Sequence, residues 1–419
     1  MSSIKEMVYL LGKKAREAAA VLASATDGEK NKALEAVAAA LEANAAALQA
    51  ENEKDLAKGA ESGLSSAMLD RLRLNDKRMK SMIDGVRDVV KLEDPVGRAY
   101  DQRIRPNGLK IYRMRVPIGV IGIIYESRPN VTVDASALTL KSGNAVILRG
   151  GSESINSNLA LAKVMSGAVA SAGLPAASVQ LVPTTDREAV GEMLKMDEKI
   201  DLIIPRGGET LIRRVVQNST IPVIKHYNGI CHVYVDGGAD LEMAGEIAFN
   251  AKVQRPGVCN AAETLLVDQA VAENFLPKML DRLRKAGVRL KGCERTRSID
   301  SSVEQATEQD WKTEYLDMVL SVRVVDGLQG AVEHIERYGS RHTDAIVTAN
   351  EQTAREFIMR VDSSSVMVNT STRFSDGAQY GLGAEIGIST DKLHARGPMG
   401  LEELTTYKWI VIGEGQLRD

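Results

Sequence analysis

Short apolar runs alternate with helix-like segments from residue 110 onward, and this alternation limits the fold more than any other feature. The apolar runs lie at 118–125, 145–148, 179–182, 202–204 and 222–224, and segments with helical character such as 155–172 and 209–217 separate them. Strands and helices that alternate at this spacing are typical of βαβ units in a parallel, doubly wound sheet.

The same alternation begins again near residue 232. We expect strands at 232–236, 264–267, 319–325, 345–348 and 365–368, separated by helices at 241–250, 271–286, 329–338 and 351–361. The α/β pattern therefore predicts two Rossmann-like lobes with a ligand cleft between them. The first hundred residues look helical, with a capping box from Thr26 to Glu29 and a following apolar stripe of Leu34, Val37, Leu41 and Leu48.

Charge and cysteine content exclude several classes of protein. Lys plus Arg is 53 and Asp plus Glu is 56, so the net charge of −3 gives no signature of nucleic-acid or anionic-membrane binding. Three cysteines are too few for a disulfide framework or a thiolate-rich metal cluster. No two histidines have helical i, i+4 spacing, so we expect no metal site. Without a basic leader or a long apolar run, we expect a cytoplasmic protein.

One of the three cysteines has the surroundings of a nucleophile. Cys259 follows Lys252, Arg255 and Gly257 in a loop before a strand. Neighbouring cations favour the thiolate, and a glycine lets the backbone approach a bound group, so that the Cys259 amide can donate to an oxyanion. Cys231 enters a strand and Cys293 lies in a polar loop, so we expect both to be structural.

Several motifs resemble the aldehyde dehydrogenase superfamily. Residues 257–261 (GVCNA) resemble its nucleophile motif, and residues 142–149 (SGNAVILR) resemble the strand that leads to its cofactor-binding lysine. Closer matches resemble the gamma-glutamyl phosphate reductase family within it: 125–133 (YESRPNVTV), 204–208 (IPRGG), 250–256 (NAKVQRP), 369–377 (NTSTRFSDG), 381–387 (GLGAEIG) and 393–398 (LHARGP). The resemblance covers roughly residues 5–415.

This resemblance implies a fold and a reaction. The fold is an aldehyde dehydrogenase-like α/β fold, with two Rossmann-like parallel-sheet lobes and a small β oligomerisation arm. The reaction is the NADPH-dependent reduction of L-glutamate 5-phosphate to L-glutamate 5-semialdehyde and phosphate, the second step of proline biosynthesis from glutamate. The alternatives are another aldehyde dehydrogenase-type oxidoreductase, or a catalytically silent protein that kept the fold.

The resemblance also implies the catalytic residues. Cys259 would form a thioester with release of phosphate, and Asn130 or Arg128 would stabilise the oxyanion, with Asn130 favoured because the family uses a neutral amide there. His226 stands where the oxidising members have a glutamate that activates water. A reductase that releases phosphate needs no water step, so the glutamate can be absent. His226 either lines the cleft or acts as a base.

The cofactor and substrate residues follow from charge and from position in the family pattern. The pair of Arg149 and Ser152 has no carboxylate nearby, and a cation in such a place suits the 2′-phosphate of NADPH. The backbone amides after Pro205 open a helix, and such amides suit a pyrophosphate. The expected cofactor-binding residues are Arg149, Ser152, Pro205, Arg206, Gly207, Gly208 and Glu314. The expected substrate-binding residues are Arg255, Arg373, Ser375 and Asp376, with Lys141 and Arg396 as weaker candidates.

The expected domains are an NADPH-binding domain at 1–105 and 128–229, a catalytic domain at 230–362, and an oligomerisation hairpin and C-terminal arm at 106–127 and 363–419. We expect at least a homodimer, and a partnership with glutamate 5-kinase is plausible. We expect no nucleic-acid or membrane partner, and the length leaves no room for a fused kinase domain.

Overall fold

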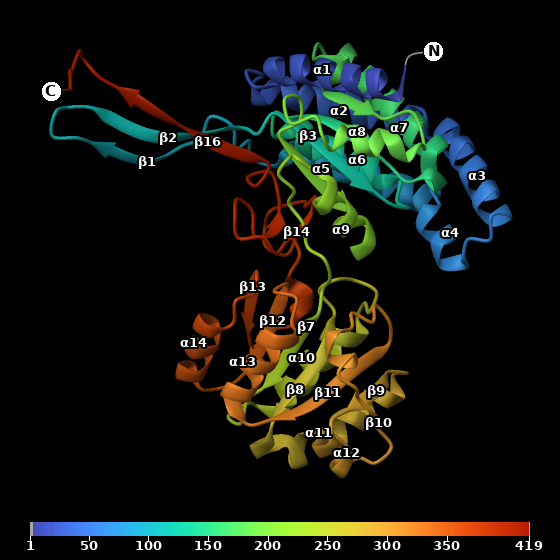
Figure 1. Ribbon diagram of the computed structural model, residues 1–419, viewed down its shortest axis with the longest axis vertical. Helices are drawn as coiled ribbons and strands as arrows, with labels where there is room; N and C mark the ends of the chain where they lie inside the picture. The colour runs from blue at the N-terminus through green and yellow to red at the C-terminus, as the bar shows by residue number, and fades with distance from the viewer. Residues whose placement is uncertain (1–2, 419) are drawn as a thin grey trace. The chain divides into compact units, whose positions relative to one another are not determined.

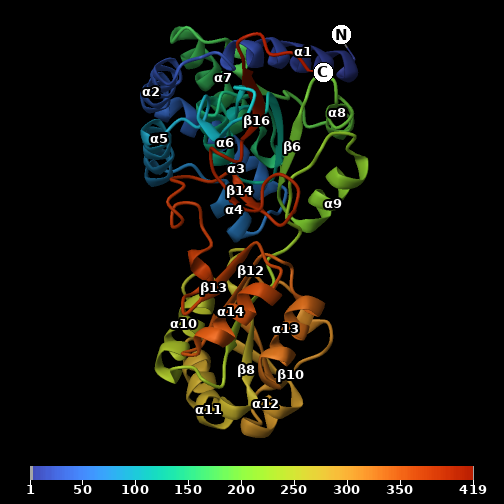
Figure 2. The ribbon, with the colours of Figure 1, turned by 90° about the vertical axis from the view of Figure 1, so that its left-hand side faces the viewer.

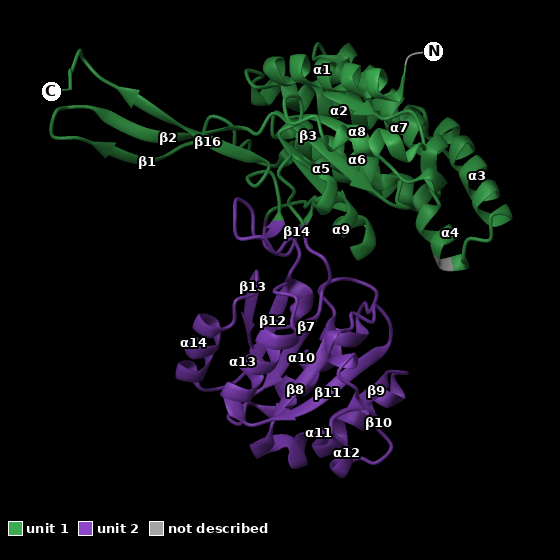
Figure 3. Cartoon of the chain, viewed as in Figure 1, with its two compact units in different colours: residues 1–225, 382–387, 399–419 green, residues 226–381, 388–398 purple. Residues whose placement is uncertain are grey.

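The computed structural model describes residues 3–418, which divide into two compact units (Figure 3). Unit 1 comprises residues 1–225, 382–387 and 399–419, and unit 2 comprises residues 226–381 and 388–398. The first crossing between the units lies four residues before the expected boundary at 229. Among the described residues, no helix is both long and apolar enough to cross a lipid bilayer.

Unit 1 begins with five helices, in a region whose sequence predicts helical structure without giving their number. They are α1 (Ile4–Leu22), α2 (Asp27–Ala43), α3 (Ala45–Glu61), α4 (Ser66–Leu72) and α5 (Asp76–Lys91). The capping box is present, because the Thr26 hydroxyl accepts from the Glu29 amide while the Glu29 carboxylate accepts from the Thr26 amide. Leu34, Val37 and Leu41 are buried on one face of α2, whereas Leu48 belongs to the next helix.

The unit 1 sheet is parallel and has the strand order β5-β4-β3-β6. Its strands are β3 (Val120–Tyr125), β4 (Ala145–Arg149), β5 (Val179–Leu181) and β6 (Leu202–Arg206). The accompanying helices are α6 (Asn130–Lys141), η1 (Ser152–Ser154), α7 (Ile155–Ser171), η2 (Ala176–Ser178), α8 (Arg187–Met193) and α9 (Glu209–Asn218). Every residue of β3 is buried, as a central strand covered on both faces requires. The run at 222–224 contributes only a bridge between Val223 and Ile203.

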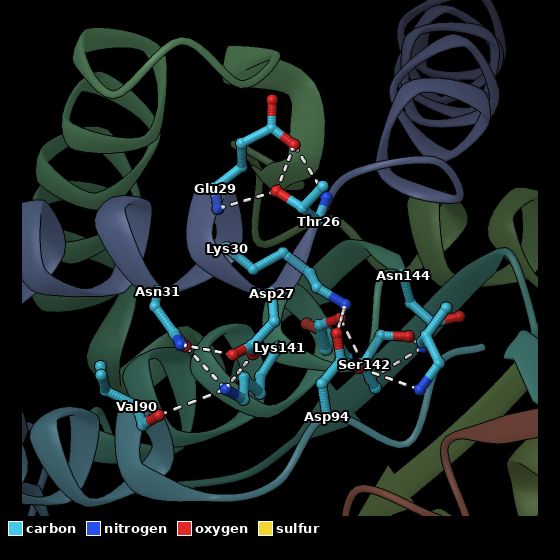
Figure 4. Close-up of polar contacts among 12 residues, drawn as sticks. Thr26, Asp27, Glu29, Lys30, Asn31, Val90, Asp94, Lys141, Ser142 and Asn144 are labelled. Carbon is cyan, nitrogen blue, oxygen red and sulfur yellow. Dashed lines mark hydrogen bonds and ion pairs between the residues drawn. The ribbon is translucent and has the colours of Figure 1, made fainter. Parts of the chain in front are cut away.

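Two buried lysines connect α2 with neighbouring segments: Lys141 reaches it from α6, and Lys30 of α2 reaches the segment after α5 (Figure 4). The Lys141 ammonium donates to Asp27 Oδ1 and to Asn31 Oδ1, each at 2.6 Å, and to the Val90 carbonyl at 3.2 Å. Lys30 pairs with Asp94. Lys141, a weaker substrate candidate from the sequence, is therefore an internal link between helices, because all three of its ammonium hydrogens have partners here.

The remaining strands of unit 1 form an antiparallel sheet that extends from the parallel one (Figure 1). They are β1 (Ala99–Ile104), β2 (Lys110–Pro117) and β16 (Thr405–Ile412), and β2 pairs with both of the others. The hairpin thus occupies 99–117 and not the expected 106–127, because Val120–Tyr125 pairs inside the parallel sheet. Both runs are β-rich, and only Ile118 and Gly119 separate them, with Gly119 at φ 131°.

Unit 2 has a seven-stranded parallel sheet with the order β10-β9-β11-β8-β7-β12-β13. Its strands are β7 (Cys231–Val235), β8 (Ala262–Asp268), β9 (Arg289–Gly292), β10 (Glu304–Gln305), β11 (Val319–Val325), β12 (Thr343–Val347) and β13 (Ser365–Val368). Its helices are α10 (Leu241–Val253), α11 (Gln269–Lys285), α12 (Glu294–Ile299), η3 (Asp310–Lys312), α13 (Gly327–Tyr338), α14 (Glu351–Arg360) and η4 (Thr372–Phe374).

Helices cover both faces of this sheet (Figure 2). Val233 and Val235 of β7 pack in a core with α10 and α11, whereas Tyr234 packs in a second core with α13 and α14. Alternate strand residues therefore point to opposite cores, as a pleated strand requires. The pattern confirms the doubly wound lobe predicted from the sequence.

The glycine-rich tail divides between the two units. Residues 382–387 and 399–419 belong to unit 1, whereas 363–381 and 388–398 belong to unit 2. The part of the expected arm that pairs with the hairpin is β16, which lies beside β2. The short strands β14 (Gly387–Ser389) and β15 (Gly397–Met399) pair in this tail. Gly387, at φ 155°, leaves room for Arg206, since a Cβ there would lie 2.5 Å from the Arg206 guanidinium.

Candidate active site

Cys259 lies in the loop between α10 and β8, at the amino-terminal edge of the unit 2 sheet. Its side chain is half-buried. The loop is attached on one side by the Cys231 thiol, which donates to the Cys259 carbonyl at 3.2 Å, and on the other by Asn260, whose Nδ2 donates to the Ser375 carbonyl at 2.9 Å. The thiol is therefore held by a fixed backbone while remaining accessible.

The other two cysteines have structural contacts, as expected. Cys231 is fully buried, and this burial raises the pKa of its thiol, so the sulfur keeps the proton that it donates to the loop. Cys293 is half-buried, with its sulfur 3.3 Å from the Thr296 hydroxyl and 3.4 Å from the Val324 amide nitrogen.

The sequence predicts Lys252 as a cation next to the Cys259 thiol, but in the structure its charge is paired with a carboxylate. Its ammonium donates to Glu263 Oε2 at 2.7 Å, and both side chains are almost fully buried. The other Glu263 oxygen accepts from the Leu316 amide at 3.1 Å. Burial raises the pKa of Glu263 to about 7, although Lys252 opposes this shift. The pair fixes the segment after Glu314, because Leu316 belongs to it.

The segment that carries Glu314 lies against the loop between α10 and β8, which carries Cys259 and is called the nucleophile loop below. Leu316 has a left-handed backbone at φ 53°, and a Cβ on Gly257 would lie 3.6 Å from its carbonyl oxygen. The structure thus brings Glu314, a predicted cofactor residue, to the amino-terminal edge that also holds Cys259.

Two arginines and Asp376 meet beside Cys259. Arg373 lines a cavity of about 270 Å³ together with Phe374 and Asp376, and its Nε donates to Gln254 Oε1 at 2.8 Å. Burial lowers the pKa of Arg373 and the positive charge of Arg255 lowers it further, whereas Asp376 and Cys259 raise it. Asp376 also accepts from the Ala378 amide at 3.0 Å. This edge can therefore bind an anion.

Ser375, a predicted substrate-binding residue, and Arg396, a weaker candidate, have other contacts. Ser375 is fully buried, and its hydroxyl lies 3.2 Å from the Ser365 hydroxyl, so this side chain does not line the cavity beside Arg373. Arg396 donates to the Asp362 carboxylate at 2.7 Å and to the Asp362 carbonyl at 3.0 Å.

Two histidines accompany Cys259, and the sequence pointed to only one of them. His226, Cys259 and His342 each offer a ligand atom, and these atoms all lie within 4.8 Å of one another. His226 Nδ1 lies 2.8 Å from the Ile388 carbonyl oxygen. Because a carbonyl only accepts, Nδ1 carries the proton and Nε2 carries the lone pair. His342 precedes β12, and no local spacing relates it to the other two.

Unit 1 contains a cavity of about 900 Å³ at the carboxyl ends of β3 and β4. Arg149, Ser152 and Arg187 are among its lining residues. Arg149 donates to the Gly150 carbonyl at 2.7 Å and to the Thr185 carbonyl at 3.0 Å, while its buried Nε has no hydrogen-bond partner among the described residues. Burial lowers the pKa of Arg149, the charge of Glu153 raises it, and the charge of Arg187 lowers it. An anion beside these two cations would relieve their repulsion.

A carboxylate also lies in this cavity, contrary to the sequence argument. Glu153 lines it, but one of its oxygens accepts from both the amide and the hydroxyl of Ser127, each at 2.6 Å. Ser127 has a left-handed backbone at φ 44°. This carboxylate is thus attached to the loop after β3, a contact that no motif in the sequence signals.

The segment 205–208 differs from the expected row of open amides. Pro205 is buried inside β6, opposite Ile124 of β3. The Gly208 amide at the start of α9 donates to Glu126 Oε2 at 2.9 Å, and a Cβ on Gly207 would lie 2.4 Å from the same oxygen. Glu126, which the sequence reading passed over, therefore occupies the helix N-terminus where a pyrophosphate was expected. Arg206 and Gly207 remain accessible at least in part.

Asn130 begins α6, and its Nδ2 donates to Asp134 Oδ2 at 2.8 Å. Burial raises the pKa of Asp134 to about 6, with Asn130 and Arg206 opposing the shift. An amide nitrogen carries two hydrogens, so this contact uses one and leaves a second donor. Arg128, the alternative oxyanion donor, is exposed.

Comparison with known proteins supplies the family. A model described as aldehyde dehydrogenase family matches residues 4–296. Gamma-glutamyl phosphate reductase of Moorella thermoacetica is 59% identical over 411 residues, which cover 98% of each chain. The crystal structure of gamma-glutamyl phosphate reductase from Thermotoga maritima has a TM-score of 0.97 at 48% identity, with 98% of this chain and 100% of that chain covered. The enzyme from Saccharomyces cerevisiae has a TM-score of 0.56 at 34% identity, with 100% and 99% covered. This chain therefore belongs to the aldehyde dehydrogenase family and, within it, to the gamma-glutamyl phosphate reductases.

Proposed function

We propose that this chain reduces L-glutamate 5-phosphate to L-glutamate 5-semialdehyde and phosphate with NADPH, through a thioester on Cys259, as the second step of proline biosynthesis from glutamate. The observation that carries the proposal is the half-buried Cys259 thiol beside Arg255 and Arg373, in a chain 59% identical to the Moorella reductase. Two guanidiniums next to a nucleophile suit a small substrate with a phosphate and a carboxylate.

The first step uses the thiolate of Cys259. Its sulfur attacks the δ-carbonyl carbon of the acyl phosphate, the bond from carbon to the phosphate oxygen breaks, and phosphate leaves with the electron pair. His226 is suited to take the thiol proton, because its Nε2 holds the lone pair. NADPH, when bound, supplies the hydride that reduces the thioester to the aldehyde. Cys259 leaves as the thiolate, and no step needs water.

Backbone and side-chain donors stabilise the charge that develops on the carbonyl oxygen. The Cys259 amide is one donor, because its own carbonyl and not its N–H is the group that Cys231 contacts. We propose Asn130 as the second donor, because the family uses a neutral amide in this role and this side chain has a hydrogen beyond the one given to Asp134. Arg128 is the alternative, and a comparison of Asn130→Ala with Arg128→Ala distinguishes them by the larger loss of kcat.

Residues of the 900 Å³ cavity would hold NADPH. Arg149 and Arg187 suit the 2′-phosphate, because they repel each other and Arg149 has an unpartnered buried Nε. Ser152 would add a hydroxyl, and Arg206 and Gly207 would contribute from the end of β6. Glu314 would hold the nicotinamide ribose from the segment next to the nucleophile loop.

The reverse reaction tests the proposal. Formation of NADPH should require pyrroline-5-carboxylate (as the semialdehyde), NADP⁺ and inorganic phosphate together. The variant Cys259→Ser should lose this activity while keeping NADPH binding, as measured by cofactor fluorescence. Oxidation of the aldehyde without phosphate would instead favour an oxidising aldehyde dehydrogenase, and full activity of Cys259→Ser would exclude the thioester.

The chain is also proposed to form at least a homodimer through the sheet of β1, β2 and β16. An association with glutamate 5-kinase would protect the labile acyl phosphate, and co-elution of the two purified enzymes tests it.

A further inference from the structure

Three side chains with ligand atoms meet at the amino-terminal edge of the unit 2 sheet. His226 precedes β7, Cys259 precedes β8, and His342 precedes β12. A ligand atom from each lies within 4.8 Å of the other two. We propose that this cluster is a zinc site, in which Zn²⁺ binds the Cys259 sulfur with both imidazoles and so blocks the nucleophile reversibly.

The donor set selects the class of metal. One thiolate and two imidazoles suit Zn²⁺, whereas Mg²⁺ and Ca²⁺ prefer oxygen ligands. Bond lengths of about 2.3 Å to sulfur and about 2.0 Å to nitrogen place tetrahedral ligands roughly 3.5 Å apart. No separation in the cluster exceeds 4.8 Å, so a shortening of at most about 1.3 Å brings its ligand atoms to that spacing.

The surroundings orient two of the ligands. The Ile388 carbonyl holds the proton of His226 on Nδ1, which leaves the Nε2 lone pair for a metal. A carbonyl that fixes the tautomer of a ligating histidine is the usual outer contact at zinc sites. His342 is buried, with Nδ1 2.9 Å from the Thr343 hydroxyl, so its ring is fixed at the start of β12.

The fourth ligand position would face the substrate side, because Cys259 and His226 are only half-buried. Binding exchanges a proton for the metal: Cys–SH and Zn²⁺ give Cys–S–Zn⁺ and H⁺, with no change of oxidation state. The same sulfur cannot bind zinc and form a thioester. The inhibitory consequence rests on the proposed function, whereas zinc binding does not.

Metal titration of the purified full-length chain tests the site. After removal of metal with a chelator, calorimetry should give one Zn²⁺ per chain, with release of a proton on binding because the metal replaces the thiol proton. Co²⁺ should give the absorption band of a cobalt–thiolate bond, and Zn²⁺ should remove that band by competition. An equal concentration of Mg²⁺ should not displace Co²⁺.

Matched variants locate the ligands. His226→Gln should weaken zinc binding by at least about 10-fold, and Cys259→Ser should remove the cobalt–thiolate band. His394→Gln, at an exposed histidine, and Cys293→Ser, at a thiol outside the cluster, should leave both signals unchanged. His342→Gln alters a buried residue, so the circular dichroism of this variant is first compared with that of the unaltered chain. If the variant does not fold, His226→Gln and Cys259→Ser decide whether the cluster binds zinc.

Two results would overturn the proposal. Unchanged zinc affinity in both His226→Gln and Cys259→Ser would place any bound zinc elsewhere. Full reductase activity with the site saturated, as judged by the cobalt band, would exclude inhibition. If the chain has no reductase activity at all, the proposed function fails. The metal titration still shows, without any activity measurement, whether the cluster binds zinc.

Discussion

Gly229 determines where the nucleophile loop can lie. A Cβ at this position would lie 2.0 Å from the Cys259 carbonyl oxygen and 2.8 Å from the Cys259 Cα, so only a residue without a side chain lets the two backbones approach. The motif that carries the thiol therefore depends on a glycine in a different segment. Sequence spacing alone does not reveal this dependence.

We predict that Gly229→Ala displaces Cys259 and lowers kcat by at least about 10-fold, while overpacking destabilises the fold by roughly 1–3 kcal/mol. Steady-state kinetics and the alkylation rate of the Cys259 thiol measure the effect. Gly167→Ala, where a Cβ meets nothing within 4 Å, is the control. Equal kinetics for the two variants would show that this contact does not position the thiol.

Asp134 predicts a pH-dependent stability. Its pKa in the folded chain is about 6, above the ordinary value of 3.8, so its contribution to stability is present below pH 3.8 and is lost as pH rises through 6. Asp134→Asn removes this loss. We expect the variant's unfolding free energy to improve by roughly 1–3 kcal/mol relative to the unaltered chain between pH 4 and pH 7. Urea unfolding at both pH values measures it, and a pH-independent difference would contradict it.

Arg149 predicts the cofactor preference. We expect Arg149→Glu to weaken NADPH binding about 10- to 100-fold more than NADH binding, because it replaces a cation with an anion where the 2′-phosphate would lie. Fluorescence titration with each cofactor measures the ratio. Lys163→Glu, an equal charge change at an exposed residue of α7, should leave the ratio unchanged. An unaltered ratio in Arg149→Glu would remove the basis for assigning NADPH.

Among the elements, the amino-terminal ends of the unit 2 strands carry the chemistry. Cys259 precedes β8, His342 precedes β12, and Glu314 precedes β11. A doubly wound sheet usually binds its ligands at the carboxyl ends of its strands, which is where the unit 1 cavity lies. The proposed cofactor residues of unit 1 and the proposed catalytic residues of unit 2 therefore lie at opposite kinds of sheet edge, carboxyl in one unit and amino in the other.

The buried pair of Lys252 and Glu263 connects the segment before β8 with the Glu314 segment before β11, so a change in the pair should affect both stability and cofactor binding. Glu263→Gln leaves Lys252 buried without its charge partner, which should cost about 3–5 kcal/mol of stability. It should also raise the KM for NADPH, because Glu263 holds the Leu316 amide next to Glu314. Urea unfolding and kinetics measure the two effects.

A double variant separates the two roles of Glu263. Lys252→Met combined with Glu263→Met should recover part of the stability but not the KM, because the apolar pair removes the unpaired charge while the Leu316 amide has no acceptor there. The exposed pair of Arg289 and Glu304 is the control, and Glu304→Gln should change little. A KM that recovers together with the stability would show that the pair does not position the Glu314 segment.

On the scale of the whole molecule, the antiparallel sheet of unit 1 exposes an apolar face. Tyr407, Trp409 and Val411 alternate along β16 and are each about half-exposed. Arg113 of β2 lies 4.6 Å from both aromatic ring centres. An exposed aromatic strand on a projecting sheet is typical of a surface that binds another chain.

We predict that light scattering will show at least a dimer, and that Val411→Glu will shift the chain toward the monomer. Thr406→Glu, on the other face of the same strand, should keep the oligomer. A monomeric unaltered chain would contradict the proposed homo-oligomer.

Local sequence was enough to predict most of the elements. Apolar runs place β11 and β13 at the observed residues, and the Thr26 capping box marks the start of α2. The hairpin boundary was wrong because 110–117 and 120–125 have the same β-rich composition, and only their pairing partners differ. The 205–208 segment was misread for a similar reason, since Glu126 reaches the Gly208 amide from another strand.

The sequence by itself determined the family, the two α/β halves and the cysteine most suited to be a nucleophile, because motifs, periodicity and charged neighbours are local properties of the chain. The tertiary structure decided which charges are already neutralised and which ligand atoms meet. Lys252 of α10 meets Glu263 of β8 across the loop that joins the two elements. Glu153 with Ser127 and His342 with Cys259 are brought together by parallel strands that place the ends of distant segments side by side. No spacing along the chain encodes those contacts, because strand order and register, which only the folded sheet defines, set them.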